Sequence, residues 1–281
     1  MTIALIGATG QLGSELASSL GENAALLGRA QIEVTDSASV EAALSAVRPR
    51  AVINAAAYNL VDRAEDEPDL ALAVNALGPR NVARYCAAHD IPLLHVSSDY
   101  VFGLAEDRNT PYAESDAPGP LSAYGTSKLA GEYFVRNLCR RHFIVRTCGL
   151  YGHNSVHGNF VETMLRLSEQ QSPLKVVDDQ QCTPTSTRDL ARAILDLIGT
   201  EAYGLYHATN AGSTTWYRFA AEIFRLADVD VELIPITTQQ FGAKARRPAY
   251  SVLDCTRLKK VRGCELPPWQ QALAEYMASR P

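Results

Sequence analysis

A glycine-rich turn between an apolar run and an amphipathic run is the feature that most constrains this chain. Residues 2–8, TIALIGA, are predicted to form a buried strand, and residues 12–20, LGSELASSL, a helix with a leucine at every fourth position. The stretch GATGQLG, residues 7–13, connects the two. A turn of this kind after the first strand is typical of sheets that bind nucleotides at their carboxyl edge.

The alternation of short apolar runs with amphipathic runs continues to about residue 150. Further strands are predicted at 24–28, 51–57, 92–98 and 142–152, with helices between them that include 67–89 and about 123–139. Near-continuous apolar strands connected by helices are typical of a parallel sheet that is covered on both faces. We therefore predict an α/β fold, a Rossmann-like doubly wound parallel sheet.

Beyond residue 150 the alternation is less regular. We predict that residues 1–150, joined by about 176–210 returning to the sheet, form the nucleotide-binding Rossmann domain. Residues 151–175 and 211–281 are predicted to form a smaller C-terminal lobe that binds the substrate.

Composition limits the partners and the compartment. The chain has 281 residues and a net charge of −5, with acidic and basic residues interspersed. We therefore expect neither a nucleic-acid nor a membrane partner. The six cysteines form no C-x-x-C pair, which favours reduced thiols and a cytoplasmic location.

Each glycine of the turn has a physical role in holding a dinucleotide. Gly7 permits the tight turn, Gly10 allows the backbone to approach a pyrophosphate, and Gly13 allows close packing of helix on strand. The amides of Gly10, Gln11 and Leu12 then point at the anion from a helix N-terminus.

Residues after the second and third strands indicate which dinucleotide is bound. Arg29 lies where NAD-binding chains carry an acidic residue, and an arginine there can pair with the 2′-phosphate of NADPH. We predict NADPH, with NADH as the alternative if Arg29 is only a solvated loop residue. Ala55, Ala56 and Ala57 leave room for a flat cofactor, although small side chains in a core would give the same pattern.

Three further residues form a candidate catalytic set. Ser98 ends a predicted strand, and Tyr124 and Lys128 lie one turn apart on one face of a predicted helix. A free tyrosine has a pKa near 10, and lowering it by about 3 units takes about 4 kcal/mol. An ammonium about 4 Å away supplies about that much in an effective dielectric of about 20. We expect Lys128, helped by the positive nicotinamide ring of the oxidised cofactor, to lower the pKa of Tyr124. Tyr124 then protonates a ketone oxygen that Ser98 also contacts.

Several stretches resemble the dTDP-4-dehydrorhamnose reductase family of extended short-chain dehydrogenases/reductases. They occur in the family's order: GATGQLG, VINAAAYNLVDRAEDEPDLALAVNALGPRNVA, HVSSDYVF, YAESDAPGPLSAYGTSKLAGE, GNFVETMLRL, DDQQCTPTSTRDLA and RRPAYSVLD. The resemblance spans nearly the whole chain. It places the family's catalytic residues on Ser98, Tyr124 and Lys128, and its cofactor contacts on Gly10, Gln11, Leu12 and Ala55 to Ala57.

The resemblance implies an activity and a substrate class. Members reduce the C4 ketone of a nucleotide-linked 6-deoxyhexose with NAD(P)H, the last step toward dTDP-L-rhamnose. The expected partner is therefore a nucleotide sugar. Asp99 and Tyr100 match positions that approach the sugar, and Asn159, Arg247 and Ser251 lie in stretches that meet the nucleotide diphosphate.

The chain departs from the family at Gly149. Relatives tend to read RTSWVYG, with the tryptophan packed against the sugar, where this chain reads RTCGLYG. The missing aromatic side chain predicts a roomier or differently supported pocket, so the exact sugar stays open.

A metal ion and a dimer are also implied by some relatives. These hold a magnesium ion at a dimer contact through a glutamate just after the glycine turn, which makes Glu15 the candidate ligand here. The alternative is a first-turn carboxylate stabilised by the helix dipole. A homodimer is common among relatives.

Three other functions share parts of this pattern. A nucleotide-sugar dehydratase needs an added acid, usually in a TDE arrangement, whereas this chain has Ser98-Asp99-Tyr100. An epimerase needs no such acid and remains an alternative. So does a non-catalytic NADP-binding subunit resembling the methionine adenosyltransferase β subunit, although a pure binder has no need for Ser98, Tyr124 and Lys128.

Overall fold

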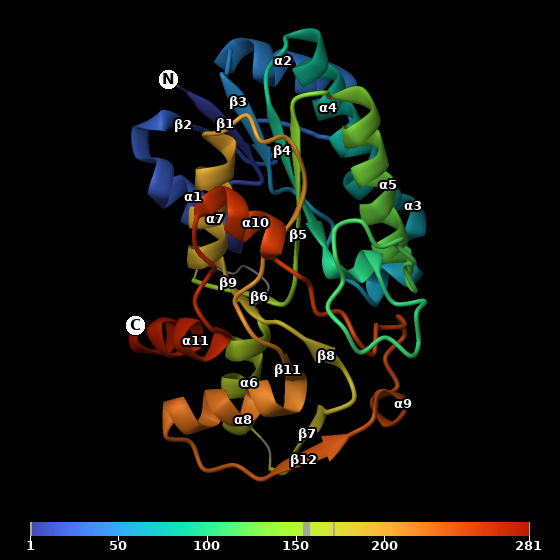
Figure 1. Cartoon of the computed structure of the whole chain (residues 1–281), viewed down its shortest axis with the longest axis vertical. Helices are drawn as coiled ribbons and strands as arrows, with labels where there is room; N and C mark the ends of the chain where they lie inside the picture. The colour runs from blue at the N-terminus through green and yellow to red at the C-terminus, as the bar shows by residue number, and fades with distance from the viewer. Residues whose placement is uncertain (1, 154–157, 171, 281) are drawn as a thin grey trace.

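A six-stranded parallel sheet runs through the centre of the computed structural model, which describes residues 2–153, 158–170 and 172–280 (Figure 1). Every neighbouring pair in this sheet is parallel. The predicted α/β fold is therefore confirmed. In spatial order the strands are β10 (Gly204–His207), β5 (His142–Thr147), β4 (Leu93–Ser98), β3 (Ala51–Asn54), β1 (Ile3–Ile6) and β2 (Ala24–Leu27).

Helices cover both faces of the sheet, and Figure 1 shows the two layers on either side of it. One layer contains α1 (Gln11–Leu20), α7 (Thr187–Ile198) and α10 (Thr256–Arg262), and the other contains α2 (Ser37–Val47), α4 (Gly78–Ala88) and α5 (Ala123–Leu138). Consecutive strand residues face opposite layers. Leu5 packs against the layer of α1 and α7, and Ile6 packs against the layer of α2 and α4. No helix in the described residues is long and apolar enough to cross a membrane.

The helix predicted for residues 67–89 is divided into three pieces. These are α3 (Pro68–Leu72), a π-helical turn η3 (Ala73–Leu77) and α4. Pro79 has no N–H to bond the carbonyl of Asn75, so the regular α-helical pattern cannot continue through this point. Shorter 3₁₀ turns are η1 (Gly21–Asn23), η2 (Arg63–Glu65) and η4 (Asp99–Val101).

A second, smaller core lies below the sheet in Figure 1. It is built mainly from α6 (Phe160–Ser168), α8 (Trp216–Ala227) and α11 (Trp269–Ala278). The short helix α9 (Thr238–Phe241) lies beside it, together with three two-stranded pairs. The pairs are β7 (Leu174–Val177) with β12 (Leu233–Ile236), β8 (Gln181–Cys182) with β11 (Thr214–Thr215), and β6 (Leu150–Tyr151) with β9 (Thr185–Ser186). The predicted binding roles of the two parts remain predictions.

The strand order has a topological switch point at the carboxyl edge of the sheet. β1 lies between β2 and β3, so the chain leaves β1 toward one side and later returns on the other. Ligands of open α/β sheets bind outside the carboxyl ends of the strands at such a point. The glycine turn and Ala55 to Ala57 follow β1 and β3 directly, so both lie at this position.

Candidate active site

The glycine turn forms a closed loop at the N-terminus of α1. Gly7 has a φ of +81°, and its carbonyl accepts a hydrogen bond from the amide of Gly10 at 3.1 Å. A Cβ on Gly13 would lie 2.1 Å from the carbonyl oxygen of Gly7, so only glycine allows this approach. Gly10 is the N-cap residue of α1 and has no side chain that could bond the first amides of the helix. The N-cap therefore leaves these amides uncovered.

Ala55 and Ala56 pack directly against the turn. A Cβ on Gly7 would lie 2.6 Å from the amide nitrogen of Ala56, and the Ala55 amide donates to Ile6 at 2.9 Å. The close approach of this backbone therefore requires a glycine at position 7. Ala57 is exposed at the end of this segment.

Arg29 is exposed in the turn that follows β2. Its charge helps to lower the pKa of the Glu33 carboxyl, after the hydrogen bonds from Thr35. Arg29 thus follows the carboxyl end of β2, the neighbour of β1, and its pairing with a 2′-phosphate remains a prediction.

Ser98 and Tyr124 come together from two elements. Ser98 is the last residue of β4, and its hydroxyl accepts a hydrogen bond from the Tyr100 amide at 3.1 Å. Tyr124 lies in the first turn of α5, and a hydrogen bond between the two side chains lowers the pKa of the phenol. Ser97 faces the other way and donates to Glu132 at 2.6 Å, as strand alternation predicts.

Two contacts bring the start of α5 close to these groups. The Ser122 hydroxyl caps the helix by accepting from the Gly125 amide, and the Glu65 carboxylate accepts from the Ala123 amide at 2.8 Å. A Cβ on Gly125 would lie 2.2 Å from the Tyr100 carbonyl oxygen. Glu65 and Gly125 were not singled out from the sequence, although a glycine inside a helical pattern signals a close backbone approach.

Burial dominates the ionisation of the pair. Burial raises the pKa of Tyr124 to about 12 and outweighs the hydrogen bond with Ser98. Burial lowers the pKa of Lys128, which is 2% exposed, to about 8. The Lys128 charge is not among the causes that shift the pKa of the phenol. In the chain without its cofactor the pKa of Tyr124 is therefore raised and not lowered, and the lowering expected with the cofactor bound stays a prediction.

At neutral pH the same two values leave Tyr124 protonated and Lys128 charged. The Lys128 ammonium donates to the Val96 carbonyl at 2.7 Å, one strand residue before Ser97. A proton donor has to hold its proton before it acts, and Tyr124 does. The arrangement suits proton transfer to a substrate.

Asp99 is the centre of a buried polar cluster beside this pair. Its carboxylate, 2% exposed, accepts from the Ser98 hydroxyl at 3.1 Å. Burial raises its pKa, and hydrogen bonds from Cys148, Ser251 and Ser98 partly offset the effect. Cys148 also contacts Cys182, and both thiols are free. Asp99 and Ser251, both predicted to bind the substrate, therefore meet.

Tyr100 and Arg247 extend the same group. The Tyr100 ring packs edge-on to the Tyr124 ring, with centroids 5.8 Å apart. Burial raises the pKa of Tyr100, and its hydroxyl interacts with the Arg247 guanidinium. Arg247 also pairs with Asp62 at 2.7 Å, a partner that the sequence pattern did not reveal.

Gly149 is covered by another aromatic residue. It has a φ of +53°, and a Cβ there would lie 3.1 Å from Cη2 of Trp216 and 3.3 Å from Cα of Pro184. The Trp216 ring, at the start of α8, packs on Phe160 with centroids 4.8 Å apart. The predicted effect of the missing tryptophan on the pocket stays a prediction.

Asn159 does not join this group. Its side chain caps α6 by accepting from the Glu162 amide, and it donates to the Gly152 carbonyl at 3.0 Å. Both ends of its amide are therefore engaged within the second core. Its predicted contact with the substrate remains a prediction.

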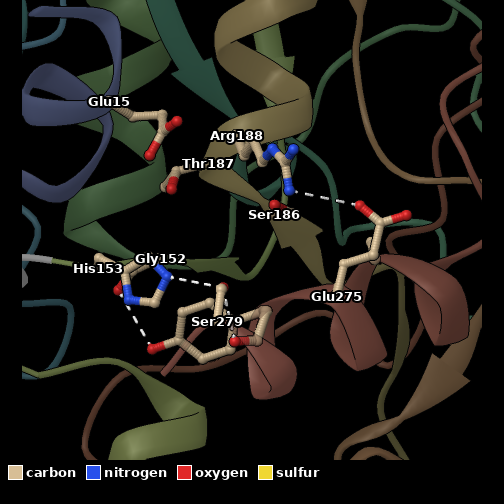
Figure 2. Close-up of a pocket in the computed structure, with 10 residues that line it drawn as sticks. Glu15, Gly152, His153, Ser186, Thr187, Arg188, Glu275 and Ser279 are labelled. Carbon is tan, nitrogen blue, oxygen red and sulfur yellow. Dashed lines mark hydrogen bonds and ion pairs between the residues drawn. The ribbon is translucent and has the colours of Figure 1, made fainter. Parts of the chain in front are cut away.

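Glu15 lies in a separate cavity of about 330 Å³ between α1, the start of α7 and α11 (Figure 2). It lies beyond the first turn of α1, so the predicted stabilisation by the helix dipole does not apply. The Arg188 guanidinium lines the same cavity and pairs with Glu275 at 3.6 Å. The described residues contain no group of three or more His, Cys, Asp or Glu side chains that could hold a metal ion. The implied magnesium site lies at a dimer contact, so Glu15 as its ligand stays a prediction.

A family profile described as the RmlD substrate binding domain matches residues 1–280. The chain belongs to this family. The resemblance inferred from the sequence motifs is thereby confirmed, and it extends over the glycine turn, the Ser98 and Tyr124 pair and the second core alike.

Individual members of the family are similar over almost their full length. A dTDP-4-dehydrorhamnose reductase of Streptomyces griseus is 43% identical over 279 residues, 96% of this chain and 90% of the relative. A probable dTDP-4,6-dihydroxy-2-methyloxan-3-one 4-ketoreductase of Streptomyces antibioticus is 41% identical over 96% of this chain and 92% of its own.

A solved structure agrees closely with the fold. The dTDP-4-dehydrorhamnose reductase of Bacillus anthracis, crystallised in complex with NADP, is 38% identical and superposes with a TM-score of 0.94 over 100% of both chains. The family fold thus accommodates NADP, and the glycine cradle of this chain has the small residues that such a fit requires.

Proposed function

We propose that this protein is an NADPH-dependent reductase of the C4 ketone of a nucleotide-linked 6-deoxyhexose, as a dTDP-4-dehydrorhamnose reductase in dTDP-L-rhamnose biosynthesis. The observation that carries the proposal is the contact between the Ser98 and Tyr124 side chains at the carboxyl edge of the sheet. Relatives at 43% and 41% identity that are named as ketone reductases support it.

The chemistry follows from the states of the three side chains. Bound NADPH supplies the hydride that reduces the carbonyl carbon. Tyr124 donates its proton to the carbonyl oxygen, and Ser98 donates a hydrogen bond to the same oxygen. The Lys128 ammonium stabilises the phenolate that remains on Tyr124 and holds the nicotinamide ribose.

The remaining contacts divide between the two parts of the chain. We assign the cofactor to the glycine turn with Gly7, Gly10, Gln11, Leu12 and Gly13, together with Arg29 and Ala55 to Ala57. The nucleotide sugar lies across Asp99, Tyr100, Ser251 and Arg247, which already meet one another, and beside Gly149 with its Trp216 cover. Residues 1–150 with about 176–210 would then bind NADPH, and 151–175 with 211–281 the substrate.

The direct test is NADPH oxidation with dTDP-4-dehydro-6-deoxy-L-mannose, followed at the absorbance of NADPH. A reductase consumes one NADPH for each alcohol formed. An epimerase would convert the sugar without net consumption, and a non-catalytic subunit would bind NADPH without turnover. Either result would contradict the proposal.

Replacing Arg29 tests the choice of cofactor. Arg29→Ala should raise the KM for NADPH about tenfold and leave the KM for NADH unchanged, because only NADPH carries the 2′-phosphate. Arg84→Ala, which removes an exposed arginine from α4, serves as the control. Equal effects on both cofactors would show that Arg29 does not read the phosphate.

The pH dependence of reduction should report Lys128 and not Tyr124. The lysine charge is present below its pKa of about 8 and is lost as the pH rises through that value. We therefore expect kcat/KM to fall on the alkaline side of about pH 8, while Tyr124 stays protonated until its pKa of about 12. Lys128→Met should abolish this limb and lower kcat about 100-fold at neutral pH. A limb that persists in Lys128→Met would belong to another group.

We further propose a cytoplasmic enzyme. All six cysteines, each within the described residues, are free thiols, which fits a reducing compartment. A homodimer remains part of the proposal on the resemblance alone. Its test is sedimentation equilibrium.

A further inference from the structure

Asp62 connects the first half of the chain to a basic segment near its end. Its Oδ1 atom accepts from the Ala245 amide at 2.9 Å and from Arg247 at 3.1 Å, and its Oδ2 atom accepts from Arg247 at 2.7 Å. The partners are 183 and 185 positions away in sequence. Such a two-oxygen fork fixes the plane of a guanidinium as well as its distance.

The Arg247 guanidinium held in this way lies next to Tyr100, a neighbour of the candidate catalytic residues. A further N–H of the same group donates to the Ala245 carbonyl at 3.1 Å, so the head is held from two sides. The guanidinium also interacts with the Tyr100 hydroxyl, and the Tyr100 ring lies against the Tyr124 ring at 5.8 Å. Two side chains, Arg247 and Tyr100, thus connect Asp62 to Tyr124.

We propose that Asp62 is a positioning residue that orients Arg247 toward the diphosphate of the nucleotide sugar. This inference rests on the proposed function, because it takes the substrate to be an anionic nucleotide sugar. Arg247 has five N–H donors, and Asp62 with the Ala245 carbonyl engages three of them. The Tyr100 hydroxyl contacts the same group, so one N–H is left for an anion while the arginine keeps one orientation.

A neighbouring ion pair provides a matched control. Asp66 pairs with Lys244 on the same two segments, but both side chains are more than half exposed, at 60% and 54%. Arg247 is only 17% exposed. Exposed pairs of this kind contribute little, so removal of the Asp66 carboxylate should leave the segment in place.

The experiment compares Asp62→Ala, Asp62→Asn and Asp66→Asn in the NADPH-loaded protein. Binding of thymidine 5′-diphosphate alone is measured by calorimetry, and KM and kcat are measured with the ketone substrate. Asp62→Ala should weaken diphosphate binding and raise KM about tenfold, with kcat within about twofold of wild type. Asp62→Asn keeps one acceptor, so its diphosphate affinity and KM should lie between those of Asp62→Ala and wild type. Asp66→Asn should match wild type in both.

The outcomes separate this inference from the proposed function. A KM that is unchanged or lowered in Asp62→Ala would overturn the positioning role, since a carboxylate that competes with the diphosphate would lower it. Losses in kcat, NADPH binding and melting temperature together would also overturn it, because they would indicate a purely structural role. A wild-type protein that neither binds the diphosphate nor reduces the ketone overturns the proposed function itself, and the positioning role with it.

Discussion

Tyr124→Phe is expected to lower kcat for ketone reduction about 1,000-fold. The substitution removes one oxygen atom, and with it the only proton that the Tyr124 side chain can give to the carbonyl oxygen. General acid catalysis typically contributes between about 100-fold and 10,000-fold, and Ser98 still contacts the oxygen in the variant. Single-turnover reduction of the ketone by bound NADPH measures the effect without interference from product release.

A matched control lies on the same helix. Tyr133 on α5 is 41% exposed, and Tyr133→Phe makes the same chemical change away from Ser98. It should leave kcat unchanged, and the dissociation constant for NADPH should be unchanged in both variants. If Tyr124→Phe retained more than about a tenth of the wild-type rate, another group would have to be the acid.

The second large effect is expected at the glycine turn, where two substitutions of the same kind should differ. Gly10 has a φ of −76°, and a Cβ there would meet its nearest neighbour, the Gly7 carbonyl, at an ordinary 3.5 Å. Gly10→Ala should therefore fold normally and weaken NADPH binding about 100-fold, because the methyl group occupies the path of the pyrophosphate.

Gly13→Ala should instead damage the fold. Its Cβ would lie 2.1 Å from the Gly7 carbonyl oxygen and 2.8 Å from Cα of Ala8, both of which belong to the backbone. We expect a loss of about 3 kcal/mol in unfolding free energy, with NADPH binding lost as a consequence. Gly199→Ala, whose nearest neighbours would be 3.6 Å away, is the control for both variants.

Thermal melting and NADPH titration together distinguish the three variants. A lowered melting temperature in Gly10→Ala would mean that the turn is tighter than its geometry indicates. Normal NADPH binding in Gly10→Ala would place the pyrophosphate elsewhere, and the assignment of the turn to the cofactor would be wrong.

The parts of the site that follow local rules could be predicted from the sequence. The helix of Tyr124 and Lys128 was expected from about residue 123 to 139 and spans Ala123–Leu138. The glycine turn lies where a nucleotide-binding turn belongs, between β1 and α1. Period and spacing determine these features, and neither depends on distant residues.

The electrostatics and the long-range partners could not be predicted in this way. The pKa of Tyr124 depends on burial by segments that fold over it, and burial raises it in the chain without its cofactor. Arg247 has a partner 185 positions away, and Trp216 covers Gly149 from the start of α8. The interruption at Pro79 did have a local signal, since a proline inside a helical pattern ends or distorts the helix.

The position of β10 at the edge of the main sheet has a consequence for biosynthesis. This strand pairs with β5, yet the chain builds part of the second core before it reaches Gly204. A nascent polypeptide released before that point leaves the backbone groups of β5 open on one side, a template for self-association. Premature termination should therefore yield insoluble fragments rather than an independent cofactor-binding unit.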